Sequence, residues 1–164
     1  MFSRNFVLAA LFTALSVVGA SIKIPAVIGS IALDSFPALL ASVLLGSGAG
    51  AFIAALGHLL SALLGGMPLG PFHLLIALEM AVLVWIFGNI YRTGSRKIAG
   101  FIFLIGNAFL APLPFLFIMG KEFFIAILPS LFIGSLFNIA VALLMIPRLV
   151  WLKGGKTDSL EANR

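Results

Sequence analysis

The sequence is an almost unbroken series of long apolar segments, most of them close to the length that an α-helix needs to cross a bilayer. One crossing of the hydrocarbon core takes about 20 helical residues. Short clusters of glycine, proline and charged residues separate the segments, and such clusters mark turns. Only 9% of the residues are charged and 62% are hydrophobic, whereas a soluble domain is about a quarter charged. The chain is therefore a membrane protein whose solvent is lipid.

We predict an all-α membrane protein, a bundle of six transmembrane helices. Pro71 suits the first position of the fourth helix, where its missing N–H needs no partner. Pro112 and Pro114 should disturb the fifth helix. A single transmembrane domain would fill residues 1–152, followed by a polar tail, 153–164, that we expect to be disordered. The predicted helices span residues 5–22, 35–45, 49–64, 71–91, 98–119 and 123–151.

The positions of the basic residues predict the orientation of this bundle. Six helices place both termini on one side, and eight of the ten Lys and Arg residues then fall with the termini. Because loops on the cytoplasmic side carry an excess of Lys and Arg, we expect both termini in the cytoplasm. The eight are Arg4, Arg92, Arg96, Lys97, Arg148, Lys153, Lys156 and Arg164, and the two on the outer side are Lys23 and Lys121.

The first apolar segment also resembles a secretory signal peptide, since it follows Arg4 and ends in Gly19-Ala20-Ser21. We interpret it as a retained first helix because every later segment is equally apolar. Residues 23–34 and 65–70 then form loops on the outer side. The short second and third helices are dense in glycine, alanine and serine, which favours close helix packing.

Several functions lack any signature in the sequence. The chain has no cysteine, which excludes disulfides, cysteine-based zinc sites and thiol nucleophiles. No nucleotide-binding or enzyme motif is present, and no basic stripe with interleaved aromatics suggests nucleic acid. His58 and His73 lie fifteen residues apart on different predicted helices, a spacing that does not support a metal site. We therefore predict no cofactor and no metal.

Polar side chains inside the predicted helices are the candidates for a binding site, because such groups are costly in a bilayer. Four of them fall at similar depth near the middle of four helices, one lies nearer the outer side, and one ends the first outer loop. They either pair with one another and hold the bundle together, or line a cavity that is open to the outside. The six candidates are His58, Glu79, Asn107 and Asn138 at mid-depth, His73 nearer the outer side, and Asp34 in the loop.

Four of these residues need not all line the cavity. His58 is equally well explained as a packing histidine. His73 and Glu79 are six residues apart, about 240° around a helix beyond one turn, so they cannot share one narrow face. The stretch Asp34-Ser35-Phe36-Pro37 looks like a helix N-cap followed by an early proline, which would stabilise the second helix without any ligand.

Ala10 and Ala14 lie one turn apart on one face of the first helix, a pattern of small residues that favours close helix contact. Taken with the stretch Leu33-Asp34-Ser35-Phe36-Pro37-Ala38-Leu39-Leu40-Ala41 and the run from Gly57-His58 to Pro68-Leu69-Gly70-Pro71, it carries a resemblance. The chain resembles the substrate-binding S components of energy-coupling-factor (ECF) vitamin transporters, from Arg4 to about Trp151. Within that family it is most similar to the α-ribazole transporters of cobamide salvage.

The resemblance implies a function and partners. An S component is a six-helix membrane protein that binds its vitamin from outside, under loops that here correspond to residues 23–34 and 65–70. A membrane scaffold subunit meets the small-residue face of the first helix, so Ala10 and Ala14 are the expected docking residues. Two ATPase subunits supply the energy, and the assembly lies in the bacterial cell membrane.

We therefore predict a binding subunit for transport and not an enzyme. The expected substrate is a vitamin or vitamin precursor, with α-ribazole the first choice. The mixture of carboxylate, amide and imidazole groups with apolar walls suits a neutral or mildly cationic, partly aromatic ligand with several hydroxyls. Open alternatives are an S component for another vitamin such as riboflavin, pantothenate or niacin, an intramembrane enzyme, and a structural subunit of another membrane complex.

Overall fold

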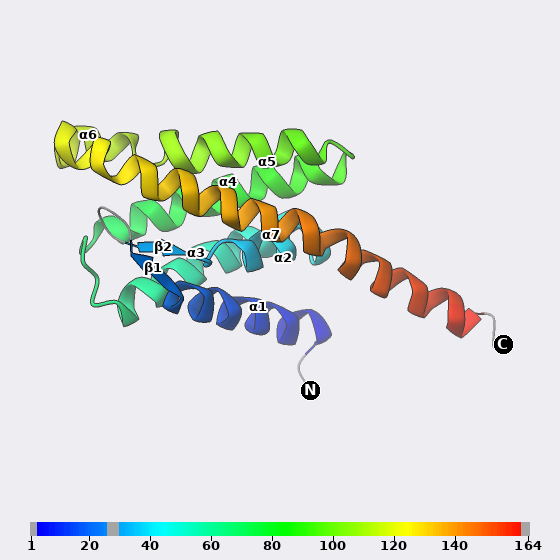
Figure 1. Cartoon of the computed structure of the whole chain (residues 1–164). Helices are drawn as coiled ribbons and strands as arrows, with labels where there is room; N and C mark the ends of the chain where they lie inside the picture. Colours follow the sequence, from blue (N-terminus) through cyan, green and yellow to red (C-terminus); the bar gives the residue numbers. More distant parts are fainter. Residues whose placement is uncertain (1–2, 26–29, 162–164) are drawn as a thin grey trace.

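A computed structural model describes residues 3–25 and 30–161 of the chain, which form a bundle of helices (Figure 1). A hairpin of two short strands interrupts the helices after the first of them. The elements in chain order are α1 (Arg4–Ser21), β1 (Lys23–Pro25), β2 (Ser30–Ala32), α2 (Phe36–Leu44), α3 (Ser47–Leu64), α4 (Phe72–Arg92), α5 (Arg96–Ile105), the π-helix η1 (Gly106–Leu110), α6 (Leu113–Ile118) and α7 (Lys121–Glu161).

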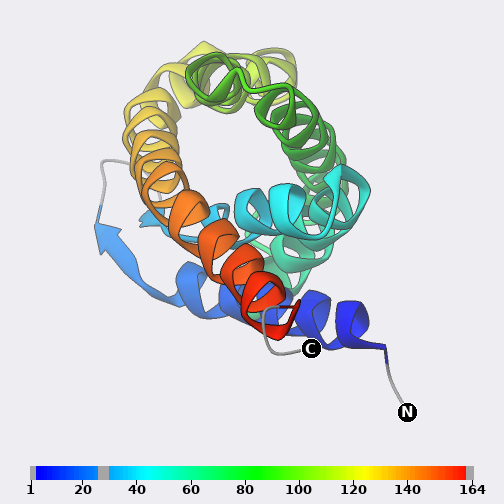
Figure 2. The ribbon, with the colours of Figure 1, turned by 90° about the vertical axis from the view of Figure 1, so that its right-hand side faces the viewer.

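The long helices run between two ends of the molecule (Figure 1). The start of α1 and the end of α7 lie at one end, which we name the terminal end. The strands β1 and β2 and the turn between α3 and α4 lie at the other end, which we name the hairpin end. Seen from the terminal end, α4, α5 and α7 form an arc whose open side is occupied by α2, with α1 outside it (Figure 2).

The nine-residue helix α2 lies in the core of this bundle. Ala38, Leu39 and Ala41 are completely buried. Gly50 on α3 and Gly88 on α4 both approach Ser42 so closely that a Cβ atom on either would lie 2.4 or 2.8 Å from the Ser42 Cβ. The expected close packing through small residues is therefore present, and it depends on glycine at two neighbouring helices.

Five stretches of the described chain are long and apolar enough to cross a membrane, by length and composition. One of them is the broken helix from Arg96 to Ile118. The helix α2 is about 14 Å long at 1.5 Å per residue, about half of the hydrocarbon thickness. The predicted helical membrane bundle is confirmed, with α2 in the place of the short second helix.

Two features differ from the sequence prediction. The predicted loop 23–34 contains an antiparallel strand pair, with Lys23 opposite Ala32, and residues 26–29 of that loop lie outside the described residues. Strands of three residues are too short to show the alternation that identifies a strand in a sequence. The prediction that the tail is disordered is wrong as far as Glu161, because α7 continues to that residue. Residues 162–164 lie outside the described residues.

The helix that contains Pro112 and Pro114 is interrupted, as predicted. The turn of π-helix η1 ends with the N–H of Ala111 donating to the carbonyl of Gly106 at 2.8 Å. Pro112 has no N–H to continue the ladder, and its ring would clash with a carbonyl one turn earlier in a regular helix. The wider turn relieves this conflict. It also changes the direction in which the side chains of η1 point, and π-turns often occur at functional sites.

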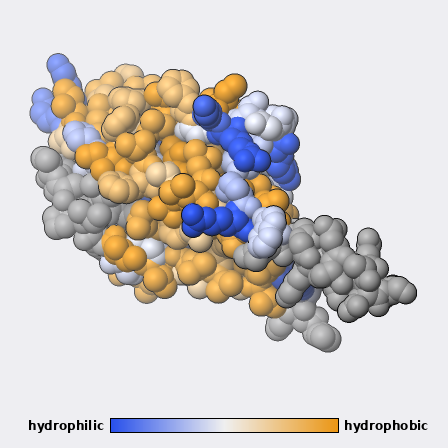
Figure 3. All heavy atoms as spheres, turned by 45° about the vertical axis from the view of Figure 1, so that its right-hand side comes forward, coloured by the Kyte–Doolittle hydropathy of each residue, from blue (hydrophilic) through white to orange (hydrophobic). Residues whose placement is uncertain are grey.

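The surface of the bundle is apolar where a soluble protein would be polar. Large side chains such as Leu78, Trp85, Phe117 and Leu144 are exposed along α4, α6 and α7. On the face shown in Figure 3, apolar residues cover most of the area and hydrophilic residues gather in a few patches. Such a surface is stable only in contact with lipid or with another membrane protein.

Candidate functional site

A cavity of about 70 Å³ lies among α4, η1, α6 and α7, and Leu69 from the turn between α3 and α4 contributes to its wall. Its polar lining residues are Glu79 and Asn107. The remaining wall is apolar and includes the aromatic rings of Phe115 and Phe123, whose centroids are 6.2 Å apart. An apolar pocket with a few convergent polar groups is the usual form of a small-molecule site, so we take this cavity, named the Glu79 cavity, as the candidate site.

Glu79 is the charged residue of this cavity. Its Oε2 atom is buried and has no hydrogen-bond partner among the residues that the structure describes. A buried polar atom without a partner is costly, and the cost is larger for a charged group. The carboxyl group is therefore ready to accept a hydrogen bond from a molecule that enters the cavity.

Asn107 is held in place by α7. Its Nδ2 donates to the Oγ of Ser135 at 2.8 Å, and the Ser135 hydroxyl in turn donates to the carbonyl of Leu131 at 2.6 Å. The π-turn carries Asn107, so an irregular stretch of backbone provides one of the two polar groups of the cavity. Sequence analysis did not single out Ser135, although a serine three residues before Asn138 inside an apolar helix was a usable signal.

Asn138 does not line the Glu79 cavity. It is 2% exposed, and its Oδ1 accepts the N–H groups of Ser35 at 3.0 Å and Phe36 at 2.8 Å. Its Nδ2 donates to the carbonyl of Gly134 at 2.8 Å. These N–H groups belong to the start of α2, which has no partner for them within the helix. Asn138 therefore caps α2 from a helix more than one hundred residues away.

Replacing Asn138 by alanine should destabilise the protein more than it affects any ligand. Two N–H groups at the start of α2 lose their acceptor, at a cost of about 1–3 kcal/mol each. At about 2–4 °C per kcal/mol for a chain of this size, the melting temperature should fall by roughly 4–24 °C. Asn138→Asp keeps an acceptor oxygen at this position, so its melting temperature should fall less. Thermal unfolding in detergent, followed by circular dichroism, measures both variants. An unchanged melting temperature in Asn138→Ala combined with lost ligand affinity would show that Asn138 binds substrate instead.

Asp34 lies two residues before the start of α2 and is half-buried. The predicted helix start with an early proline is confirmed, because Ser35 is the cap position and Pro37 lies in the first turn. The acceptor for the first N–H groups is Asn138 and not Asp34. The Ser35 hydroxyl donates to Asp34 Oδ1 at 2.9 Å. Burial raises the pKa of Asp34, and its hydrogen bonds oppose this rise. Asp34 does not line the Glu79 cavity.

His58 and His73 lie against each other. The Nε2 of His58 is 3.1 Å from the Nδ1 of His73, and the ring centroids are 5.2 Å apart. The expected depth of His58, level with Glu79 and below His73, is therefore wrong. The pair does not line the Glu79 cavity, and no cluster of three potential metal ligands occurs in the part of the chain that the structure describes.

Ala10 and Ala14 are both exposed on α1, on the side opposite to its buried residues Phe12, Thr13, Ser16 and Gly19. A groove of about 600 Å³ runs between α1, α2 and α7, on a different side of α1 from Ala10 and Ala14, neither of which lines it. Its walls are almost entirely apolar, and Arg4 and Asn5 at the start of α1 also line it. This apolar groove is large enough to receive side chains from a second membrane protein.

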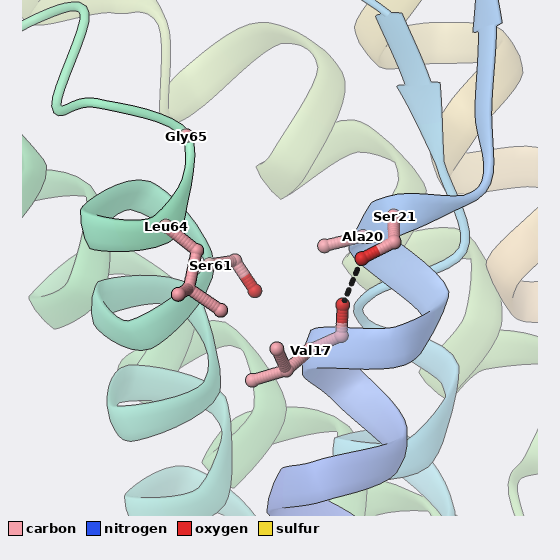
Figure 4. A pocket seen from close by; sticks show the side chains of 6 residues that line it. All are labelled: Val17, Ala20, Ser21, Ser61, Leu64 and Gly65. Atoms are coloured by element: carbon pink, nitrogen blue, oxygen red, sulfur yellow. Dashed lines mark hydrogen bonds between the residues drawn. The ribbon is translucent and has the colours of Figure 1, made fainter.

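A small space of about 90 Å³ between α1 and α3 is a poor candidate for a ligand (Figure 4). Two of its six lining residues carry hydroxyl groups. Ser21 donates to the carbonyl of Val17 at 3.1 Å, and Ser61 donates to the carbonyl of Gly57 at 2.7 Å. Since both hydroxyl hydrogens are used on their own helices, the space is better explained as a packing gap.

An apolar bundle that encloses a cavity lined by Glu79 and Asn107 has the architecture of a membrane protein with a small-molecule site. The family model of the substrate-specific component of ECF transporters matches residues 4–155, and the chain therefore belongs to this family. A solved structure described as the S component of a bacterial ECF transporter is 25% identical, with a TM-score of 0.65 over 90% of this chain and 95% of the other. Comparison with curated proteins gives no match.

Family membership confirms the prediction of an S component of an ECF transporter. Such proteins bind the substrate for transport and are not enzymes, and they act with a scaffold and ATPase subunits. The family and the apolar helices also confirm that the chain is a membrane protein.

Proposed function

We propose that this chain is the S component of a bacterial ECF importer for a vitamin or vitamin precursor, and that its substrate is α-ribazole. The observation that carries the substrate assignment is the unpaired Glu79 carboxyl in a cavity with aromatic walls. α-Ribazole joins an aromatic benzimidazole to a sugar with several hydroxyls. The ring can stack on Phe115 and Phe123, and a hydroxyl can donate to Glu79.

The same carboxyl argues against some of the alternative vitamins. Pantothenate and niacin carry a carboxylate, and a second negative charge next to a buried Glu79 would be repelled in a medium of low dielectric constant. Riboflavin is neutral, aromatic and rich in hydroxyls, so it remains the second candidate. The Glu79 carboxyl thus favours neutral over anionic substrates, and this argument is stronger than any from the shape of the cavity.

In the proposed site, Glu79 and Asn107 contact the substrate directly. The other four candidates, Asp34, His58, His73 and Asn138, have supporting roles around the cavity. At about 70 Å³, the cavity is well below the roughly 300–1,000 Å³ typical of sites for molecules of this size. Entry of substrate therefore requires the walls to move. Leu69 is the wall residue that lies in the turn between α3 and α4, so we expect the movement there.

We further propose six crossings, with α2 as the short one, and both termini in the cytoplasm. Support comes from the described basic residues at the terminal end, which include Arg4, Arg92, Arg96 and Lys97. The hairpin end then faces outside, with residues 65–70 as one proposed lid and 23–34 as the other. Residues 1–152 form the transmembrane domain and 153–164 a polar cytoplasmic tail, in the bacterial cell membrane.

The proposed partners are a membrane scaffold subunit and two ATPase subunits. Ala10 and Ala14 are the proposed contact residues for the scaffold, because they present small side chains on the exposed side of α1. The proposal includes no cofactor and no metal.

Purification of the protein in mild detergent, followed by mass spectrometry of the extracted small molecules, tests the substrate assignment. We expect a benzimidazole riboside at close to one molecule per chain. Recovery of riboflavin would move the assignment to the second candidate. Recovery of a carboxylate vitamin would contradict the role proposed for Glu79, although the chain would still be an S component.

A further inference from the structure

The turn between α3 and α4 is tightly folded by its own backbone. The N–H of Met67 donates to the carbonyl of Ala62 at 2.8 Å, and that of Gly66 to the carbonyl of Leu63 at 3.1 Å. These two bonds and the positive φ of Gly66, 83°, define a Schellman motif at the end of α3. The chain therefore folds back along α3 before α4 begins, which brings residue 69 close to the first turn of α4.

A side chain fixes the last part of this turn. The N–H of Leu69 donates to the Nε2 of His73 at 3.3 Å. Leu69 also lines the Glu79 cavity. One residue is therefore held by His73 through its backbone and forms part of the cavity wall through its side chain.

The direction of this bond determines where the protons of the histidine pair are. An N–H donor requires an acceptor, so the Nε2 of His73 carries no hydrogen. A neutral His73 then carries its hydrogen on Nδ1 and donates it to the Nε2 of His58, 3.1 Å away. A neutral His58 in turn carries its hydrogen on Nδ1. This arrangement also argues against a metal between the rings, because His73 Nδ1 is occupied by a proton.

We propose that neutral His73 is a positioning residue that holds Leu69, within the turn 65–70, against the substrate cavity, and that protonation of His73 releases Leu69. This proposal rests on the proposed function in one respect, namely that the Glu79 cavity binds the substrate. A second proton on His73 would turn Nε2 into a donor, which cannot accept the N–H of Leu69. The backbone of Leu69 is thus held when the histidine pair is neutral and released when His73 is charged.

The surroundings contain few other groups that could set the charge of His73. His58 on α3 faces it directly and would be repelled by a charged His73. Glu79 is six residues further along α4, on a different side of the helix. Lys121 and Glu122 are exposed at the start of α7, at the same end of the bundle. Burial of His73, which is 6% exposed, disfavours its charged form, and a charge on the neighbouring His58 would disfavour it as well.

Hydrogen exchange of the backbone amides, measured in lipid nanodiscs without any ligand, tests the proposal. Protection factors, which correct for the intrinsic effect of pH on exchange, are compared from about pH 8 to about pH 4, because burial of the His73 ring opposes its protonation and extends the range to be covered below that of a free histidine. In the wild type, we expect the protection of the Leu69 amide to fall by about tenfold towards low pH, equivalent to one hydrogen bond. Amides in the middle of α4 should keep their protection.

Two variants separate positioning from a general loss of structure. In His73→Gln, the side-chain oxygen can accept the Leu69 N–H without titrating, so protection should stay high at every pH. In His73→Ala, it should be low at every pH. If His73→Ala does not fold, the pH dependence of Leu69 protection in the wild type, compared with that in His73→Gln, still tests the proposal. Protection that does not change with pH in the wild type, or that falls equally in His73→Gln, would overturn the proposal. Because no ligand is present, these outcomes are independent of the identity of the substrate.

Discussion

Replacing Glu79 by alanine should lower the affinity for the transported molecule by about 10- to 100-fold and leave the protein folded. A hydrogen bond to a charged group contributes about 1.5–3 kcal/mol, and each 1.4 kcal/mol is a factor of ten. The Oε2 atom has no partner among the described residues, so its removal breaks no bond of that atom within the described protein. Isothermal titration of α-ribazole, or of whichever compound co-purifies, measures the loss.

Two further variants make this result specific. Glu122→Ala removes an exposed glutamate at the start of α7 and should bind like the wild type. Glu79→Gln keeps the shape and one acceptor, so a neutral hydroxyl ligand should lose less affinity than in Glu79→Ala, whereas a cationic ligand should lose nearly as much. Wild-type affinity in Glu79→Ala would show that the substrate binds elsewhere.

The double replacement Ala10→Leu and Ala14→Leu should abolish uptake while ligand binding stays normal. Both alanines are exposed on α1, so larger side chains can be added without disturbing the core. They would, however, hold a partner helix several ångströms away from a surface that requires close approach. Uptake of labelled substrate by cells that express the whole transporter, compared with binding by the purified subunit, measures the two effects separately.

The matched control for this pair is Ala140→Leu, since Ala140 is an exposed alanine on α7. It makes the same Ala→Leu change once on a different helix and should leave uptake unchanged, and each α1 replacement alone gives the matched comparison. Normal uptake in the α1 double variant would contradict the proposal that this face binds the scaffold. Lost uptake in Ala140→Leu as well would instead indicate that any added bulk on the surface interferes.

The parts of the fold that depend on local chemistry were predictable. Apolar length, together with glycine and proline at the breaks, identified the helices, and the disturbance at Pro112 and Pro114 follows from the missing N–H of proline. Counting residues along the helices also suggested that Glu79 and Asn107 lie at similar depth, and both line one cavity. These inferences need only the rise per residue and the direction of each helix.

The parts that depend on the path of a turn, or on distant contacts, were not predictable. The pairing of His58 with His73 follows from the fold-back of the chain after α3, which two backbone hydrogen bonds determine. The cap that Asn138 provides for α2 joins residues that no local pattern connects. A mid-helix asparagine has the same appearance in a sequence whether it binds a ligand or a helix end, so only the contact distinguishes them.

The cap from Asn138 also imposes an order on the assembly of the protein in the membrane. Helix α2 is made early in synthesis, whereas the asparagine that satisfies its first N–H groups lies in the last helix. Until α7 has entered the bilayer, those N–H groups must remain near water or find a temporary partner, because lipid offers none. The central helix of the bundle is therefore among the first elements to be synthesised and among the last to be completed.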